Sequence, residues 1–189
     1  MRRSKSLRLI AAAALVFVSA AAGQCSSKPA PPPPALTPIV SVEELMEHIV
    51  DPAATVIFDS VVITATREGI VETKPTTEED WIKVQRAALV IAEATNLLKM
   101  PRKIAEDDDA PQPGAGPELT PPQILAKIDA DRAAWGKYAD GLREVAVKGI
   151  AVAKAKDVNG VFDLGGALDV ACENCHLEYW YPGDKSAEK

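Results

Sequence analysis

Long stretches with a helical repeat of apolar residues, separated by proline-rich breaks, constrain the fold of this chain more than any other feature. From Ser41 onward we find no alternation of apolar and polar residues that would predict a sheet, and no β-branched run bounded by tight turns. We expect four helices, over about residues 41–66, 76–100, 120–156 and 161–181. Four helices of this length bury their apolar stripes most simply against one another, so the sequence predicts an all-α fold, an antiparallel four-helix bundle.

Residues with capping chemistry mark the expected helix starts. They are Ser41 with Glu44 three residues on, then Thr76 or Thr77, and then Thr120 ahead of Pro121. Pro52 follows Asp51 and is expected to kink or restart the first helix, because it has no N–H to donate. Residues 102–119 are acidic and rich in Pro and Gly, which predicts a long surface loop rather than a fifth element.

The first 24 residues have the composition of a bacterial export signal: a basic start, MRRSKSLRL, and then an apolar run too short to span a membrane. Its removal takes away four basic residues and changes the formal net charge from −6 to −10. A domain this acidic is unsuited to nucleic acid, which requires a basic surface. We therefore expect an exported protein of the periplasm.

Cys25 follows the apolar run in AAGQCSSKPAPPPP, which resembles a bacterial lipoprotein signal. In such signals the cysteine becomes the lipidated first residue, and it would anchor this protein to a membrane. The alternative is ordinary cleavage near Ala22 or Gly23, which would leave Cys25 as a free thiol. In both cases residues 25–40 are predicted to be a Pro-rich tether ahead of a folded domain over 41–182 and a polar tail over 183–189.

Residues 172–176 read CENCH and hold two of the three cysteines and one of the two histidines. Two thiols at this spacing on a helix can each add to a haem vinyl group, and the adjacent histidine can coordinate the iron. We therefore predict that Cys172 and Cys175 bind one haem c covalently and that His176 is the proximal iron ligand. The alternatives are a thioredoxin-like redox motif, a zinc site that would need His48 or Cys25 as well, and a short-loop disulfide.

A CENCH motif on the last of four expected helices resembles the cytochrome c prime and cytochrome c556 family, over about residues 41–181. The matching residues are Cys172, Cys175, His176 and the aromatic Tyr179. The resemblance implies a four-helix bundle with one haem on its C-terminal helix, and homodimers, which are common in the family. Family members commonly have Arg directly after the aromatic residue, where this chain has Trp180.

The sixth iron ligand separates two functions that the resemblance allows. Met46 shares the apolar face of the first helix with Val42 and Ile49 and resembles the methionine that low-spin c556-type members use, although it is also a candidate core residue. His48 lies roughly 200 degrees around that helix and is expected at the surface. Met100, beside Pro101, is expected to pack at a helix end.

Met–His ligation predicts an electron carrier that serves redox partner proteins and is not an enzyme. The alternative is a five-coordinate haem protein that binds small gases, NO or CO. We find no nucleophile–base pair, phosphate loop or pair of acid/base carboxylates. The larger aromatic residues of the helices are expected to be mostly core; these are Trp81, Trp135, Tyr138, Phe162 and Trp180.

Overall fold

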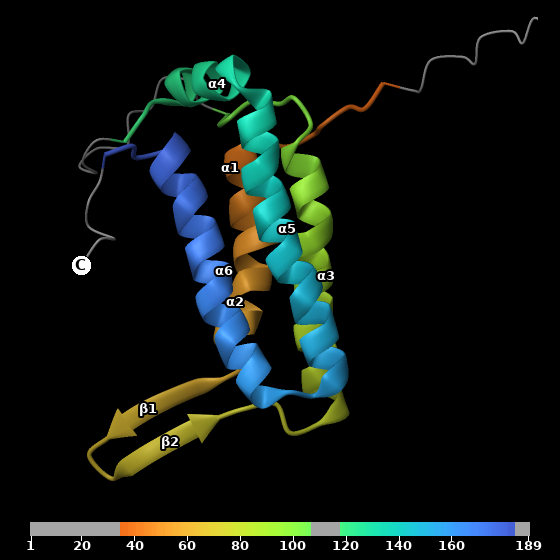
Figure 1. Ribbon diagram of the computed structural model, residues 1–189, viewed down its shortest axis with the longest axis vertical. Coiled ribbons are helices and arrows are strands. Elements are labelled where there is room, and N and C mark those ends of the chain that lie inside the picture. Colours follow the sequence, from red (N-terminus) through yellow and green to blue (C-terminus); the bar gives the residue numbers. More distant parts are fainter. Residues whose placement is uncertain (1–34, 107–117, 184–189) are drawn as a thin grey trace, which may run out of the picture. The chain divides into compact units, whose positions relative to one another are not determined.

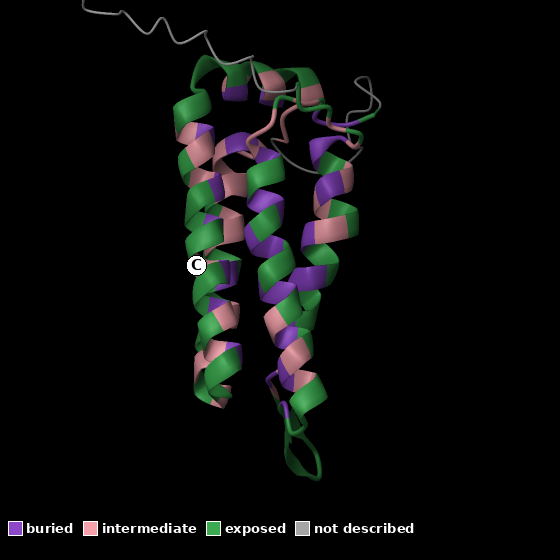
Figure 2. Cartoon of the chain, turned by 90° about the vertical axis from the view of Figure 1, so that its right-hand side faces the viewer, coloured by how far each residue is buried: buried purple, intermediate pink, exposed green. Residues whose placement is uncertain are grey.

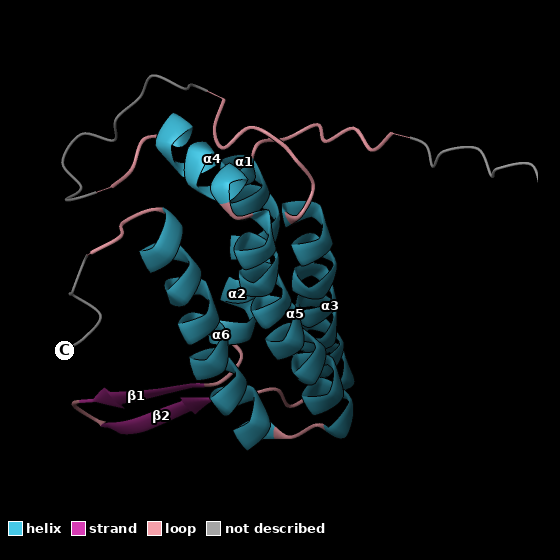
Figure 3. Cartoon of the chain, turned by 45° about the horizontal axis from the view of Figure 1, so that its top comes forward, coloured by secondary structure: helices cyan, strands magenta, loops and turns pink. Residues whose placement is uncertain are grey.

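The computed structural model describes residues 35–106 and 118–183, which are predominantly helical and carry a small two-stranded sheet (Figures 1 and 3). In chain order the elements are α1 (Val42–Leu45), the π-helical turn η1 (Met46–Val50), α2 (Asp51–Phe58), β1 (Val62–Thr66), β2 (Gly69–Thr73), α3 (Glu78–Leu98), α4 (Pro121–Ala130), α5 (Arg132–Ala155) and α6 (Val158–Tyr179). The predicted export signal, Cys25, most of the tether and nearly all of the predicted tail lie outside the described residues.

The first helix begins at the predicted capping box. Ser41 donates its N–H to Glu44 Oε2 at 2.9 Å, and Glu44 N–H donates to Ser41 Oγ at 3.1 Å. The two next N–H groups of this helix end, those of Val42 and Glu43, donate to the carbonyls of Lys103 and Ile104 at 2.9 Å each. The start of the 102–119 segment therefore satisfies helix-end donors, although it was predicted as a plain surface loop.

A π-helical turn joins α1 to α2, in the place where Pro52 predicted an irregularity. The N–H of Asp51 donates to the carbonyl of Met46, five residues back. Pro52 has no N–H with which to continue an α-helical ladder, so the chain accommodates one extra residue in this turn. Met46 is its first residue.

The prediction that the first helix continues to Thr66, within a purely all-α fold, is wrong. The helix ends at Phe58, and β1 pairs antiparallel with β2 in the register Val62↔Thr73 to Thr66↔Gly69. Gly69 has a φ of 136°, which favours glycine, so it suits the end of the turn. The β-branched run VVIT was the overlooked strand signal.

The third predicted helix is two helices. Thr120 is the N-cap of α4 as expected, but the chain breaks at Asp131, with φ −147° and ψ 77°, before α5 begins. The Asp131 side chain accepts the N–H of Ala134 at 2.9 Å and so caps α5. Figure 1 shows α4 turned across the end of the long helices.

The other predicted helices are confirmed in place. Thr77 caps α3 with a second capping box through Asp80. α6 begins at Val158 and ends at Tyr179, before Pro182. The start of α6 extends a few residues into the 157–160 segment that was predicted as a turn, because Asp157 accepts the Gly160 N–H at 3.0 Å as its cap.

The main core lies between the inward faces of α2, α3, α5 and α6, which appear as buried stripes in Figure 2. It is rich in alanine, so these helices can pack closely. Its buried members are Ala53, Ala54, Ile57, Ala87, Ala88, Ile91, Ala92, Leu142, Ala146, Leu164 and Leu168. A second cluster, which includes Trp135 and Tyr179, packs α4 against the ends of α1, α5 and α6.

Candidate functional site

A cavity of about 240 Å³ lies between the first helix, α5 and α6. The three predicted motif residues line it: Cys172, Cys175 and His176 of α6. Met46 of η1 lines it as well. The structure thus brings the predicted haem attachment motif and the candidate sixth ligand to one cavity.

The motif lies in the last turns of α6, where 3.6 residues per turn place Cys172, Cys175 and His176 on one face. All three side chains are half-buried. Both cysteines are free thiols that no disulfide joins. This is the arrangement that attachment of a ligand to two sulfur atoms and one imidazole of a single helical face requires.

Burial shifts the pKa values of all three motif residues toward the neutral form. It raises the pKa of Cys172 to about 11, with help from the nearby carboxylates of Asp169, Asp51 and Glu173. It raises the pKa of Cys175 to about 12, with smaller contributions from Cys172 and Glu178. Burial lowers the pKa of His176, so its imidazole is neutral at neutral pH and a ring nitrogen is available to a metal.

Aromatic rings surround the histidine end of the motif. Ring centroids of Trp180 and Tyr181 each lie 6.0 Å from that of His176. The Tyr181 hydroxyl lies 3.2 Å from Glu173 Oε2, to which it donates. Trp180, which stands where the family commonly has Arg, therefore contacts His176 through its ring.

Tyr179 and Trp135 fix the end of α6 against α5. Tyr179 is 2% exposed, and its ring meets Trp135 edge-on at 5.0 Å and Tyr138 edge-on at 5.6 Å. The Trp135 indole N–H donates to the carbonyl of Leu98 at 2.8 Å. The prediction that the large aromatic residues are core is confirmed for Trp81 and Trp135, whereas Phe162 is exposed. Trp135, Tyr138 and Trp180 also line the cavity.

The first helix supplies another part of the cavity wall. Four of its residues recur at a spacing of four and line the cavity: Met46, Val50, Ala54 and Phe58. Of these four residues only Met46 was predicted to face the haem, although their four-residue spacing is visible in the sequence. Leu98 and Leu142 add further apolar lining from α3 and α5.

The two competing ligand candidates lie elsewhere. His48 is exposed and is not part of the cavity wall, as predicted. Met100 is half-buried at the end of α3, where its sulfur lies 3.8 Å from an Nη of Arg102 beside a separate small cavity. Of these three side chains, only Met46 reaches the cavity of His176.

The lining residues fit a haem in kind. Besides the carboxylates of Asp51, Asp169 and Glu173, the lining has apolar and aromatic walls, two thiols, an imidazole and a thioether, which are groups that a covalently bound porphyrin uses. The cavity is slightly smaller than the roughly 300–1,000 Å³ typical of small-molecule pockets, so lining side chains would have to move outward for a porphyrin to enter.

Within residues 35–106 and 118–183, no three His, Cys, Asp or Glu side chains gather in a way that could hold a metal ion. Iron that is held by a porphyrin and one or two side chains does not require such a cluster. Among these same described residues, no helix combines the length and the apolar character that a membrane span requires.

No family model matches the chain, and no curated protein or solved structure matches it. The family resemblance therefore rests on the chain's own motif and on the placement of that motif.

Proposed function

We propose that this protein is a monohaem c-type cytochrome that carries single electrons in the periplasm. The observation that supports this best is the shared cavity, which Met46 lines from the first helix while Cys172, Cys175 and His176 line it from α6. We propose further that the protein is a cytochrome of the c prime or c556 type. The long helices α2, α3, α5 and α6 are then its four-helix bundle, with the hairpin and α4 added to it.

Each motif residue has a defined role in this proposal. The thiols of Cys172 and Cys175 would hold a haem covalently, each through one S–C bond to a vinyl group, with the thiol hydrogen going to the neighbouring vinyl carbon. No oxidant is required. His176 and Met46 would hold the iron, and a bound haem would supply the iron(III)/iron(II) couple. A Met–His pair favours the reduced state and leaves no open site for a gas.

Optical spectra of the full chain, expressed with haem attachment machinery, test the proposal. We expect haem that remains bound under denaturing conditions, sharp low-spin ferrous bands and a ferric methionine charge-transfer band in the far red. Simultaneous replacement of Cys172 and Cys175 by Ala should abolish covalent attachment. A high-spin spectrum that shifts with carbon monoxide would instead support the gas-binding alternative, and an absence of covalent haem would contradict both functions.

Localisation is tested separately with Cys25→Ser. If Cys25 carries a lipid, the parent protein fractionates with membranes and the variant is released into the soluble periplasm. A parent protein that is already soluble in the periplasm would show ordinary cleavage, and retention of the uncleaved chain in the cytoplasm would contradict the export prediction.

A further inference from the structure

The hairpin of β1 and β2 projects from the end of the long helices (Figures 1 and 3). All of β2 and all of β1 except Val62 is exposed. Three of its apolar side chains are largely uncovered: Ile63 at 59%, Ile70 at 78% and Val71 at 54% exposure. A two-stranded hairpin with no apolar face covered is marginally stable in water, so a further strand would stabilise it.

The two edges of the hairpin differ in charge. β1 reads VITAT, without a charged residue or a proline, and most of its residues are β-branched. β2 reads GIVET, and its Glu72 forms an ion pair with Lys74 at 3.0 Å. Charged side chains and prolines are what protect sheet edges from pairing. The β1 edge lacks that protection, whereas the β2 edge has it.

We propose that a second copy of this chain pairs with the first through β1, so that the two hairpins form one four-stranded antiparallel sheet. The two-fold axis of this sheet passes beside Thr64. In this pairing Thr64 faces Thr64 of the partner subunit, and Ile63 faces Ala65 of the partner subunit. Facing threonines form a stabilising cross-strand pair, because their hydroxyl groups can hydrogen-bond to each other.

The residue pattern of β1 favours a second copy over another partner. When β1 pairs antiparallel with a second β1 centred on Thr64, threonine faces threonine and the apolar Ile63 faces the apolar Ala65. The observed register places Ile70 beside Ala65, so the pairing extends one apolar row over three strands, from Ile70 through Ala65 to Ile63 of the partner subunit, and Glu72 lies beside Ile63 at the outer edge. The new contact contains no charge. This matters because copies of a chain with a formal net charge of −6 repel one another through their acidic surfaces. The proposal does not depend on haem binding.

Disulfide trapping tests the register directly, in the full chain with Cys25→Ser as the parent. Facing Cα atoms of antiparallel strands lie about 4.5–5.5 Å apart, a separation that a disulfide spans. With a mild oxidant, Thr64→Cys should therefore give a cross-linked dimer on a non-reducing gel. Val71→Cys is the matched control, since Val71 is the β2 residue opposite Thr64 and lies one strand away from the axis. The Val71→Cys variant should give no cross-linked dimer on this gel, and neither should the parent.

Light scattering provides the second measurement. The parent should have the mass of a dimer, Thr64→Lys should halve that mass by setting two like charges opposite each other, and Val71→Lys should retain it. A monomeric parent at its highest soluble concentration would overturn the proposal. So would a dimer that survives Thr64→Lys, or equal cross-linking by the Thr64→Cys and Val71→Cys variants. If Thr64→Lys fails to fold, the cross-linking result decides.

Discussion

Met46 and His176 line one cavity, although they belong to the first and last helices of the described chain. Met46 begins the π-helical turn η1, which exists because Pro52 cannot continue the α-helical ladder. π-helical turns of this kind are frequent at functional sites, since the extra residue redirects the side chains of the turn. The irregularity that the proline imposes is thus located where the proposed sixth ligand is needed.

The first prediction concerns this ligand. Met46→Ala should convert the haem-loaded protein from low spin to high spin, with loss of the far-red charge-transfer band and a new spectral response to carbon monoxide. Met100→Ala is the matched control, because it removes the other methionine of the described residues, which lies outside the cavity. A Met46→Ala protein that stays low-spin would reject the ligand assignment while leaving covalent attachment by Cys172 and Cys175 intact.

Local signals in the sequence were sufficient for the starts of the first helix and of α3. Ser41 and Thr77 both cap through side chains three residues along the chain, so no distant contact is needed to set them. The segment after Phe58 was misread because an apolar β-branched run suits either a helix or a strand. Its conformation is decided by the turn that ends at Gly69 and by pairing with β2.

The remaining differences between the predicted and the observed structure arise from tertiary contacts. The apolar repeat is continuous across Asp131, and the break there depends on α4 packing Ile124 and Ile128 into the cluster that contains Trp135. The motif at 172–176 was evident from its residue types. Its approach to Met46 depends on how the first helix packs against α6, which periodicity alone does not specify.

The second prediction concerns the buried hydrogen bond from Trp135 to Leu98. Trp135→Phe keeps most of the ring but leaves the Leu98 carbonyl without its 2.8 Å donor. The free energy of unfolding, measured with denaturant, should fall by about 1–3 kcal/mol. Phe162→Leu is the control on an exposed aromatic residue of α6, and it should change the value by less than about 0.5 kcal/mol. Equal effects of the two variants would contradict the contribution assigned to this bond.

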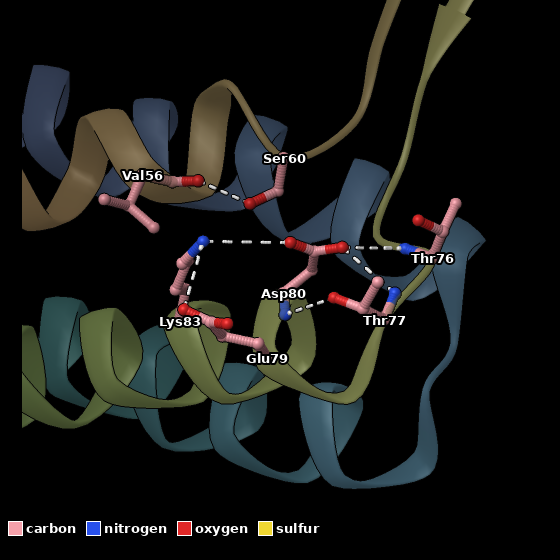
Figure 4. Close-up of polar contacts among 7 residues, drawn as sticks. All are labelled: Val56, Ser60, Thr76, Thr77, Glu79, Asp80 and Lys83. Atoms are coloured by element: carbon pink, nitrogen blue, oxygen red, sulfur yellow. Dashed lines mark hydrogen bonds and ion pairs between the residues drawn. The ribbon is translucent and has the colours of Figure 1, made fainter.

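The third prediction is a pH dependence from the cap of α3. The Asp80 carboxylate accepts N–H groups from Thr77 at 3.0 Å and Thr76 at 3.2 Å (Figure 4). The Thr77 side chain, these two backbone bonds and the charge of Lys83 together lower the pKa of Asp80 from 3.8 to about 2. A lowered pKa means that the stabilisation is fully present above pH 3.8 and is lost as the pH falls toward about 2.

Thermal unfolding of the parent and of Asp80→Asn at a series of pH values measures this contribution. The parent should melt at the higher temperature near neutral pH, and the difference should vanish between pH 3.8 and about 2. A difference that persists unchanged at the acidic end would show that Asp80 contributes by packing rather than by charge.

The last prediction concerns a close approach between α5 and α6. A Cβ atom on Gly149 would lie 2.7 Å from Leu164 Cδ2 and 3.2 Å from the Ala88 Cβ, whereas a Cβ on Gly141, in the same helix, would meet no atom within 4 Å. Both Gly→Ala changes gain helix propensity of about 1 kcal/mol. Gly141→Ala should therefore stabilise the protein, while overpacking should cost Gly149→Ala about 1–3 kcal/mol. The difference between the two unfolding free energies isolates the contact, and equal values would show that α6 is not packed against α5 at Gly149.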